Sequence, residues 1–399
     1  MNTPTYNETL GISISVFKPA IDIAGGPTYT MRGQLVDGWL NQNIDSYNHE
    51  ILANGGWWSA SMSLSGSLVD MEDWFVNGLN RHIEVYNFAL VKIWEGFVNQ
   101  VALSAGTLQA TRGPLMDIAN RVSVVYSPIL DATVAPPLEG SETTTTIANN
   151  TASQARYGIF EQVISGGKLL DDGTTDDATE LRDTYLAENR EPETGEEINL
   201  GSSATASVQI DLLGYVHRLQ GWIYQNTVAA TAQLDATIPA ILAADPNAMF
   251  TAANSTIATN ALLVSGYSDD NQMAWDVIQR LVSLGDAAGN RYTFGVYDNQ
   301  HAIYAIAPTD TTAYQHRIAG ESMDIETYTT GETVQPWDVL PARWMFLPDF
   351  LAGQKQDIDQ RLDPRFLFIE SVRFTAPSLV QVSGQKISRI PQMIARLGA

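Results

Sequence analysis

Residues 58–65 alternate strictly between apolar side chains and serine, and no other feature of the chain constrains its fold as strongly. The apolar positions are Trp58, Ala60, Met62 and Leu64, and a serine follows each of them. Successive side chains point to opposite faces in a β-strand, so this period of two predicts a long strand with one buried face and one serine face. We expect Met62→Asp to lower the stability, because it places a charge on the buried face, and Ser61→Asp to be tolerated.

A first β-rich unit is expected over residues 1–130. Turns containing two glycines each, at residues 25–27 and 54–56, separate its strands, and a short helix is expected over residues 70–77. Many short strands with such punctuation are typical of a barrel or a sandwich. The strands are expected at residues 12–17, 29–35, 44–52, 56–65, 83–91, 93–101, 107–111 and 121–126.

A linker and helical segment is expected over residues 131–200. Two prolines followed by a run of four threonines indicate a linker or an exposed loop. One helix is predicted over residues 154–165. A second helix is predicted to begin at a capping box over residues 177–180, and an acidic loop is predicted over residues 191–197.

An α/β middle domain is expected over residues 201–310, and a C-terminal β segment over residues 311–399. The middle domain is predicted to contain a strand at 208–212, helices at 233–244 and 271–284, and a β-hairpin formed by residues 291–297 and 301–306. The C-terminal segment is predicted to contain strands at 365–374, 379–382 and 386–390, with a turn at Ser383 and Gly384.

The composition disfavours several classes of protein. The chain has 399 residues and a formal net charge of −23, which disfavours nucleic-acid binding because phosphate recognition needs clustered cations. It contains no cysteine, so disulfides and thiolate chemistry are excluded. The N-terminus resembles no signal peptide, and no apolar run reaches the ~20 residues that a membrane span needs. We therefore expect a soluble protein made in a cytoplasm.

No catalytic, cofactor-binding or metal-binding residue is predicted. The chain contains neither a phosphate-binding glycine loop nor a G-x-S-x-G elbow, and its five histidines are scattered. His82 and Glu84 would share one strand face, but the sequence supplies no third ligand beside them. The acidic residues between Asp171 and Asp177 do not have EF-hand spacing, so a solvated loop is the preferred interpretation. We expect that the protein is not an enzyme.

Several motifs, taken in order, resemble the tail-tip and baseplate hub proteins of tailed bacteriophages. The first domain of these proteins is similar to residues 56–64, 85–86, 91–98 and 117–122, and later parts resemble residues 153–158, 181–186, 208–219, 274–276 and 292–297. The resemblance implies a β-rich α+β fold, with tube-type antiparallel β-barrel domains and smaller inserted α/β domains. It also implies a homotrimeric ring that joins the tail tube to the distal tip and leaves a lumen for DNA in transit.

The same resemblance implies its partners and its place. The partners would be a tail-tube or distal tail protein, a tape-measure protein, and tip or fibre proteins, and the location would be the virion tail, assembled in the host cytoplasm. We further expect the N-terminal and C-terminal β regions to pack together and face the lumen. Residues 169–199 contain eleven acidic and two basic residues, whereas the chain from Ser371 onward has four basic and no acidic ones, which suits either complementary assembly faces or two solvated surfaces.

Two other classes remain as alternatives. A receptor- or carbohydrate-binding tail module is favoured by the abundant tryptophan and tyrosine, of which the chain has nine and fifteen. A cell-wall-degrading enzyme using acidic residues is less favoured, because 45 acidic residues make any chosen pair uninformative. The chain also lacks a recognisable lysozyme or peptidase extension.

Overall fold

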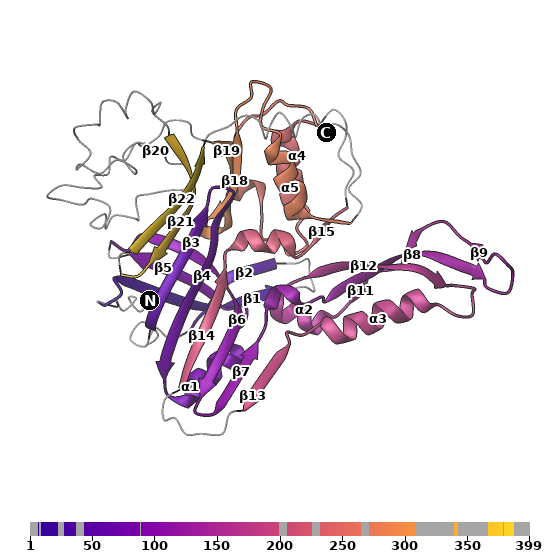
Figure 1. Ribbon diagram of the computed structural model, residues 1–399, viewed down its shortest axis with the longest axis horizontal. Coiled ribbons are helices and arrows are strands. Elements are labelled where there is room, and N and C mark those ends of the chain that lie inside the picture. The colour runs from indigo at the N-terminus through magenta and orange to yellow at the C-terminus, as the bar shows by residue number, and fades with distance from the viewer. Residues whose placement is uncertain are drawn as a thin grey trace, which may run out of the picture.

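A mixed sheet of 15 strands forms the centre of the computed structural model, and an arm projects from it (Figure 1). The β-rich α+β class predicted from the sequence is confirmed. The structure describes residues 7, 9–22, 28–36, 44–87, 89–198, 206–225, 232–264, 271–307, 339–341, 366–377 and 379–386.

The first part of the sheet comes from the N-terminal third of the chain. Its strands are mostly antiparallel and are joined by short turns, as the alternating pattern predicts. Its elements are β1 (Ile12–Asp22), β2 (Thr28–Val36), β3 (Ile44–Leu52), β4 (Gly55–Gly66), α1 (Leu68–Asn77), β5 (His82–Asn87), β6 (Lys92–Ala105), β7 (Leu108–Arg112) and the 3-10 turn η2 (Leu115–Asp117).

The arm has its own five-stranded sheet, which is covered by a helix. Its small core is built from Val124, Tyr126 and Ala178, with Ile164 and Leu169 packed against them. The arm contains β8 (Arg121–Asp131), β9 (Leu138–Glu139), β10 (Thr143–Thr144), β11 (Ala148–Asn149), α2 (Thr151–Tyr157), β12 (Glu161–Leu170) and α3 (Asp177–Asn189).

The chain then returns to the central sheet. Strand β14 hydrogen-bonds to β4 on one side and to β6 on the other, so a strand that follows residue 200 completes the N-terminal sheet. The returning elements are β13 (Thr194–Ile198), β14 (Ala206–Leu213), η3 (Tyr215–Gln220), β15 (Ile223–Tyr224), α4 (Leu234–Ala243), η4 (Ala252–Asn254), β16 (Ser255–Ile257), β17 (Gln272–Met273), α5 (Ala274–Ser283), β18 (Tyr292–Tyr297), η5 (Asp298–Gln300) and β19 (His301–Ile306).

The last described elements are β20 (Val339–Pro341), β21 (Phe366–Thr375) and β22 (Leu379–Lys386). Strand β21 pairs antiparallel with β3, from Ser371 opposite Leu52 to Thr375 opposite Asn48. Strands from the two ends of the chain therefore lie side by side. The division of the chain into segments 1–130, 131–200, 201–310 and 311–399 remains a proposal. Most of residues 311–399, including the expected strand at 386–390 beyond Lys386, lie outside the described residues.

Three sequence predictions are wrong in the arm and beyond it. The helix expected over residues 154–165 ends at Tyr157, because Gly158 has a φ of 87°, and residues from Glu161 onward pair with β8 instead. A short apolar run fits both a helix and a buried strand. The acidic segment at 191–197, expected to be a loop, contains β13, which pairs with β7. Ser383 and Gly384, which were expected to form a turn, lie within β22 instead. They sit at a register shift in the pairing of β22 with β21.

The remaining strong patterns are confirmed within one to six residues at their ends. Helix α5 and the β18–β19 hairpin lie where the sequence predicts them, and β3 has the predicted bounds. Ser67, whose side chain accepts a hydrogen bond from the Asp70 backbone N–H at 3.3 Å, begins α1 two residues earlier than expected. Strand β5 ends at Asn87 rather than at Val91, since Leu90 adopts a positive φ of 59° in the following turn.

One hydrophobic core joins the sheet to the helices behind it. It includes Met62, Trp74, Trp94 and Ile210, which are all at most 2% exposed. Gly56 lets β4 approach β18 closely, because a Cβ there would lie 2.5 Å from the Val296 carbonyl oxygen. No helix among the described residues is long and apolar enough to cross a membrane.

His49 is a polar member of this core, at the contact between β3 and β21. Its side chain is 4% exposed, and its ring centroid lies 5.6 Å from that of Tyr47 and 5.2 Å from that of Phe374. Burial lowers the pKa of His49 to about 3 and, with a smaller opposing effect of Gln220 and Trp58, lowers the pKa of His217 to about 4. Both side chains are therefore neutral at physiological pH.

We expect the protein to lose stability on mild acidification. Below the usual histidine pKa of 6.5 the unfolded chain binds protons that the folded chain excludes, so stability present above 6.5 is lost as the pH falls. Between about pH 6 and pH 4 each histidine should reduce the free energy of unfolding by up to about 1.4 kcal/mol per pH unit. Denaturation midpoints across this range should show a shallower pH dependence for His49→Phe. An unchanged dependence in that variant would contradict the assignment.

Candidate functional site

The solvent-facing side of strands β3, β4, β14 and β6 is a continuous polar surface. In register, Ser63 of β4 lies beside Ser46 of β3 and Gln209 of β14, and Gln209 lies beside Ala102 of β6. We call this surface the serine face. It consists of Asn48 and Glu50 on β3, Ser59, Ser61, Ser63 and Ser65 on β4, Ser207, Gln209 and Asp211 on β14, and Gln100, Ala102 and Ser104 on β6, all of them at least partly exposed.

Hydroxyl and amide groups dominate the serine face. Asn48 Nδ2 donates to Ser61 Oγ at 2.6 Å, and the hydroxyls of Ser46 and Ser63 lie 2.6 Å apart. Its carboxylates are Glu50 and Asp211, and Asp45 at its border accepts a hydrogen bond from Ser65 Oγ at 3.0 Å. Burial raises the pKa of Asp211 against a smaller opposing effect of Gln209. None of the four β4 serines hydrogen-bonds to a histidine in the described part of the chain. The face therefore offers hydration and hydrogen bonding.

The other side of the same strands is apolar, as the alternation predicts. Met62 and Leu64 are 0% exposed and pack in the core with Met71 and Trp74 of α1. Helix α1 contacts β4, β6 and β14, so it covers this side of the sheet. The sequence thus predicts the two sides of β4 correctly.

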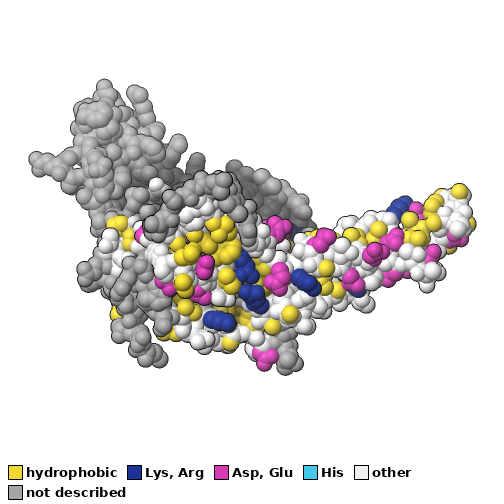
Figure 2. All heavy atoms as spheres, turned by 90° about the horizontal axis from the view of Figure 1, so that it is seen from below, with side chains coloured by type: hydrophobic (Ala, Val, Ile, Leu, Met, Phe, Trp, Pro, Cys, Tyr) yellow, Lys and Arg dark blue, Asp and Glu magenta, His cyan; other side chains and the backbone are white. Residues whose placement is uncertain are grey.

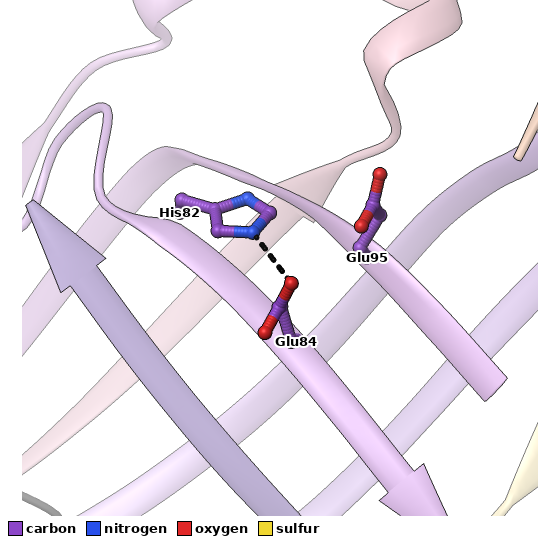
Figure 3. Close-up of side chains that lie close together, drawn as sticks. All are labelled: His82, Glu84 and Glu95. Atoms are coloured by element: carbon purple, nitrogen blue, oxygen red, sulfur yellow. Dashed lines mark ion pairs between the residues drawn. The ribbon is translucent and has the colours of Figure 1, made fainter. Parts of the chain in front are cut away.

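A second polar site is a buried cluster formed by the neighbouring strands β5 and β6. His82 and Glu84 project from β5, and Glu95 projects from the directly opposite position of β6 (Figure 3). Their ligand atoms lie within 4.8 Å of one another, and all three side chains are buried. The third ligand that the sequence analysis did not find is Glu95, and it comes from the neighbouring strand β6. Only the pairing of Glu84 with Glu95 reveals it.

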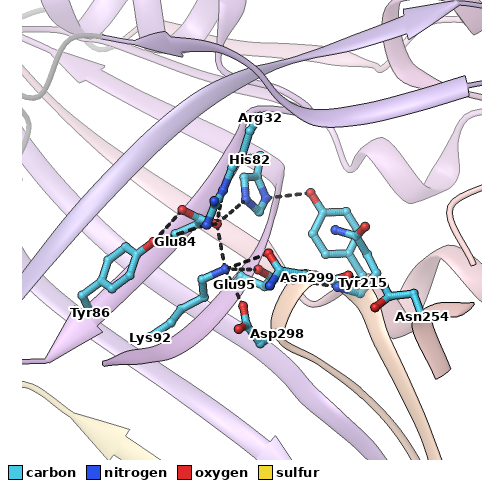
Figure 4. Close-up of polar contacts among 11 residues, drawn as sticks. Arg32, His82, Glu84, Tyr86, Lys92, Glu95, Tyr215, Asn254, Asp298 and Asn299 are labelled. Carbon is cyan, nitrogen blue, oxygen red and sulfur yellow. Dashed lines mark hydrogen bonds and ion pairs between the residues drawn. The ribbon is translucent and has the colours of Figure 1, made fainter. Parts of the chain in front are cut away.

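Lys92 occupies the centre of this cluster (Figure 4). Its Nζ lies 2.8 Å from Glu84 Oε1, 2.8 Å from Glu95 Oε2 and 2.5 Å from Asp298 Oδ1. Arg32 adds a second cation, with Nη2 at 2.5 Å from Glu84 Oε1. We call these residues, with His82, the charge cluster. Residue types that suit a divalent cation are present, but the Lys92 ammonium already pairs with both buried carboxylates, and Arg32 supplies a second positive charge beside Glu84.

The pKa shifts have clear causes. Burial alone would raise the pKa of Glu84, but hydrogen bonds and charge from His82 and Lys92 outweigh it and hold the pKa well below its usual value. Burial would lower the pKa of Lys92, but Glu95, Asp298 and Glu84 raise it above its usual value. Burial and the Glu84 carboxylate, which accepts the Tyr86 hydroxyl at 2.8 Å, raise the pKa of Tyr86 to about 12. Glu84 and Lys92 therefore stay ionised at neutral pH.

The charge cluster also joins distant parts of the chain. The Gln300 backbone N–H donates to Glu95 Oε1 at 3.0 Å, and Lys92 Nζ donates to Asn299 Oδ1 at 3.5 Å. These contacts hold the η5 turn of the β18–β19 hairpin against β6. The charge cluster has the arrangement of a structural ion-pair network. That the chain has no metal-binding or catalytic residue remains a prediction.

Most of the described tryptophans lie in the hydrophobic core. Trp57, Trp74, Trp94, Trp222 and Trp275 are all at most 7% exposed, and Trp58 is partly buried. Trp39, Trp337 and Trp344 lie outside the described residues.

Comparison with known proteins finds likeness only among solved structures. No protein-family model matches the chain, and no curated protein matches it. The chain is similar to the E. coli c3393 protein, a type VI secretion system component described as structurally similar to bacteriophage T4 tail proteins, with a TM-score of 0.42, 6% identity, and coverage of 87% of this chain and 74% of that one.

Two tail proteins give similar values. A tail protein from Neisseria meningitidis MC58 has a TM-score of 0.42 and 7% identity, and covers 96% of this chain and 98% of its own. A 43 kDa tail protein of prophage MuSo2 from Shewanella oneidensis has a TM-score of 0.40 and 8% identity, with coverage of 95% and 97%. Likeness at this level defines no family, so the proposal below depends on the residues of this chain.

Proposed function

We propose that the protein is a structural component of a bacteriophage tail, a hub ring that joins the tail tube to the distal tip. The class comes from the sequence resemblance described above. The observation that supports it best is the serine face, a broad polar surface on a sheet whose other side is fully buried. A subunit that lines a water-filled channel needs such a surface, and it needs no catalytic group.

The charge of the serine face suits the passage of DNA. Its two carboxylates, Glu50 and Asp211, repel phosphate, and it contains no lysine or arginine. DNA is retained where cations displace its counterions, so a neutral to acidic lining lets the duplex move. In the proposed ring, β4 and β14 line the lumen and the core packs outside them.

A homotrimer with tube-type β domains is the proposed assembly. Neighbouring subunits would cover the exposed strand edges, which otherwise template aggregation. Permanent interfaces of this kind bury about 2,000–5,000 Å². The proposed partners are the tail tube or distal tail protein, the tape-measure protein, and tip or fibre proteins, in a virion tail assembled in the host cytoplasm.

The carbohydrate-binding alternative has less support. Sugar-binding platforms present an exposed aromatic ring, whereas five of the described tryptophans are buried. An enzymatic role also has less support, because Lys92 already pairs with the buried carboxylates of the charge cluster, and none of the β4 serines bonds to a histidine in the described residues.

Cations on the serine face should block DNA delivery without blocking assembly. In phage carrying Ser63→Lys together with Gln209→Lys, we expect intact tails on electron micrographs and at least a tenfold lower rate of DNA ejection, because the new cations retain phosphate. Thr184→Lys with Ala187→Lys, on exposed positions of α3, adds the same charge, is the matched control and should eject DNA normally. Absence of the protein from purified tails would contradict the proposal, as would normal ejection by the serine-face variant.

A further inference from the structure

The far end of the arm is an exposed apolar tip. Figure 1 shows the arm extending away from the central sheet, and Figure 2 shows hydrophobic side chains at its end. Leu130, Val134 and Leu138 are 45%, 46% and 55% exposed, and Pro136 and Pro137 are exposed between them. Residues 131–142, which we call the tip, contain three carboxylates and no lysine or arginine. A clustered apolar surface with an acidic rim marks an interaction site.

A groove on the body has the opposite character. Its cavity of about 630 Å³ lies between the second half of β1, the C-terminal end of α1 and helix α2, where the arm joins the body, and we call it the basic groove. Its walls include the apolar side chains of Val36, Leu79 and Ala155 and the cationic side chains of Lys18, Arg81 and Arg156. Beside it, Val76 of α1 is 50% exposed. Figure 2 shows basic side chains next to a hydrophobic surface on this side of the body.

Two of the groove cations have no acidic partner in the described part of the chain. Arg81 pairs with Asp73 at 2.6 Å, but no carboxylate lies within 4 Å of Lys18 or Arg156 there. Arg156 instead donates to the Val76 carbonyl at 3.3 Å and lies over the Tyr157 ring. In a chain with net charge −23, a groove with unpaired cations suits an acidic ligand.

We propose that the tip of one copy of this chain docks in the basic groove of the next copy. Leu138 and Val134 would contact the apolar walls, while Glu139 and Glu142 would face Lys18 and Arg156. The arm points away from its own body, so the occupant is a second copy (Figure 1). Contact between two different surfaces of identical subunits is head-to-tail, and it closes a ring when the rotation permits. This inference rests on the proposed ring and names the contact that builds it.

A charge-swap experiment tests the docking. Glu139→Lys with Glu142→Lys reverses the tip, and Lys18→Glu with Arg156→Glu reverses the groove. The four side chains are all exposed, and the Glu139 ion pair with Lys168 is a surface pair of small energetic weight, so the variants should fold. Sedimentation velocity of the full-length chain should show an oligomer for the wild type, at least a tenfold weaker association for each double variant, and recovery in the fourfold variant.

The control carries the same charge change elsewhere on the arm. Glu180→Lys with Glu188→Lys, on exposed positions of α3, should assemble like the wild type. The docking is overturned if the wild type is monomeric, if the double variants assemble normally, or if the fourfold variant does not recover. The tail proposal is judged separately by the presence of the protein in purified tails, so the two failures are distinguishable.

Discussion

Met62→Asp should lower the free energy of unfolding by about 4 kcal/mol or more, because it buries a carboxylate without a partner. Met62 is 0% exposed and lies between Tyr47 of β3 and Ile210 of β14, which are both core residues. None of these neighbours can neutralise a charge. Chemical denaturation of the purified variant should show an early midpoint, or the variant should fail to accumulate as folded protein.

The matched control is Ser63→Asp, one residue further along β4, rather than Ser61→Asp. The structure places Asp211 directly opposite Ser61, so Ser61→Asp would bring two carboxylates together and is less well tolerated than the sequence suggests. Ser63 has Gln209 and Ser46 as neighbours, and Ser63→Asp should change stability by less than about 1 kcal/mol. A large loss in Ser63→Asp would show that the serine face is not a solvated surface.

Lys92→Met should cost about 3–5 kcal/mol, because it leaves two buried carboxylates without their shared cation. The Glu84 and Glu95 side chains are each 1% exposed, so water cannot replace the ammonium. The matched control is Lys168→Met, whose ion pair with Glu139 is exposed and should be worth no more than about 1 kcal/mol. Equal losses in the two variants would contradict the account of the charge cluster.

The loss in Lys92→Met should depend on pH in a defined direction. In the wild type the lowered pKa of Glu84 gives stability that is present above its usual value of 4.5 and is lost as the pH falls further. Without Lys92, the effect of burial on Glu84 is less well opposed and its pKa rises, so the variant is penalised most at neutral pH. The difference between variant and wild type should therefore shrink as the pH falls from 7 toward about 5, and denaturation curves at these pH values measure it.

Strand positions and their faces were predictable because side-chain alternation is a local property. The β4 pattern identified its buried side residue by residue, and the α5 stripe identified a helix. Where local patterns were ambiguous, the predictions failed. The apolar residues Val163 and Ile164 fit a helical stripe as well as a strand, and only pairing with β8 decides between them.

Composition and local alternation were enough to predict the β-rich class, the two-sided character of β4 and the absence of thiol chemistry, since each depends on composition or on neighbours within a few residues. The charge cluster is visible only in the folded chain, because it joins Lys92 to Asp298, about 200 residues away, through strand register that no local pattern encodes. The same holds for β14, which inserts between β4 and β6. Cross-strand pairing is set by the burial of whole faces, and burial is a property of the assembled chain.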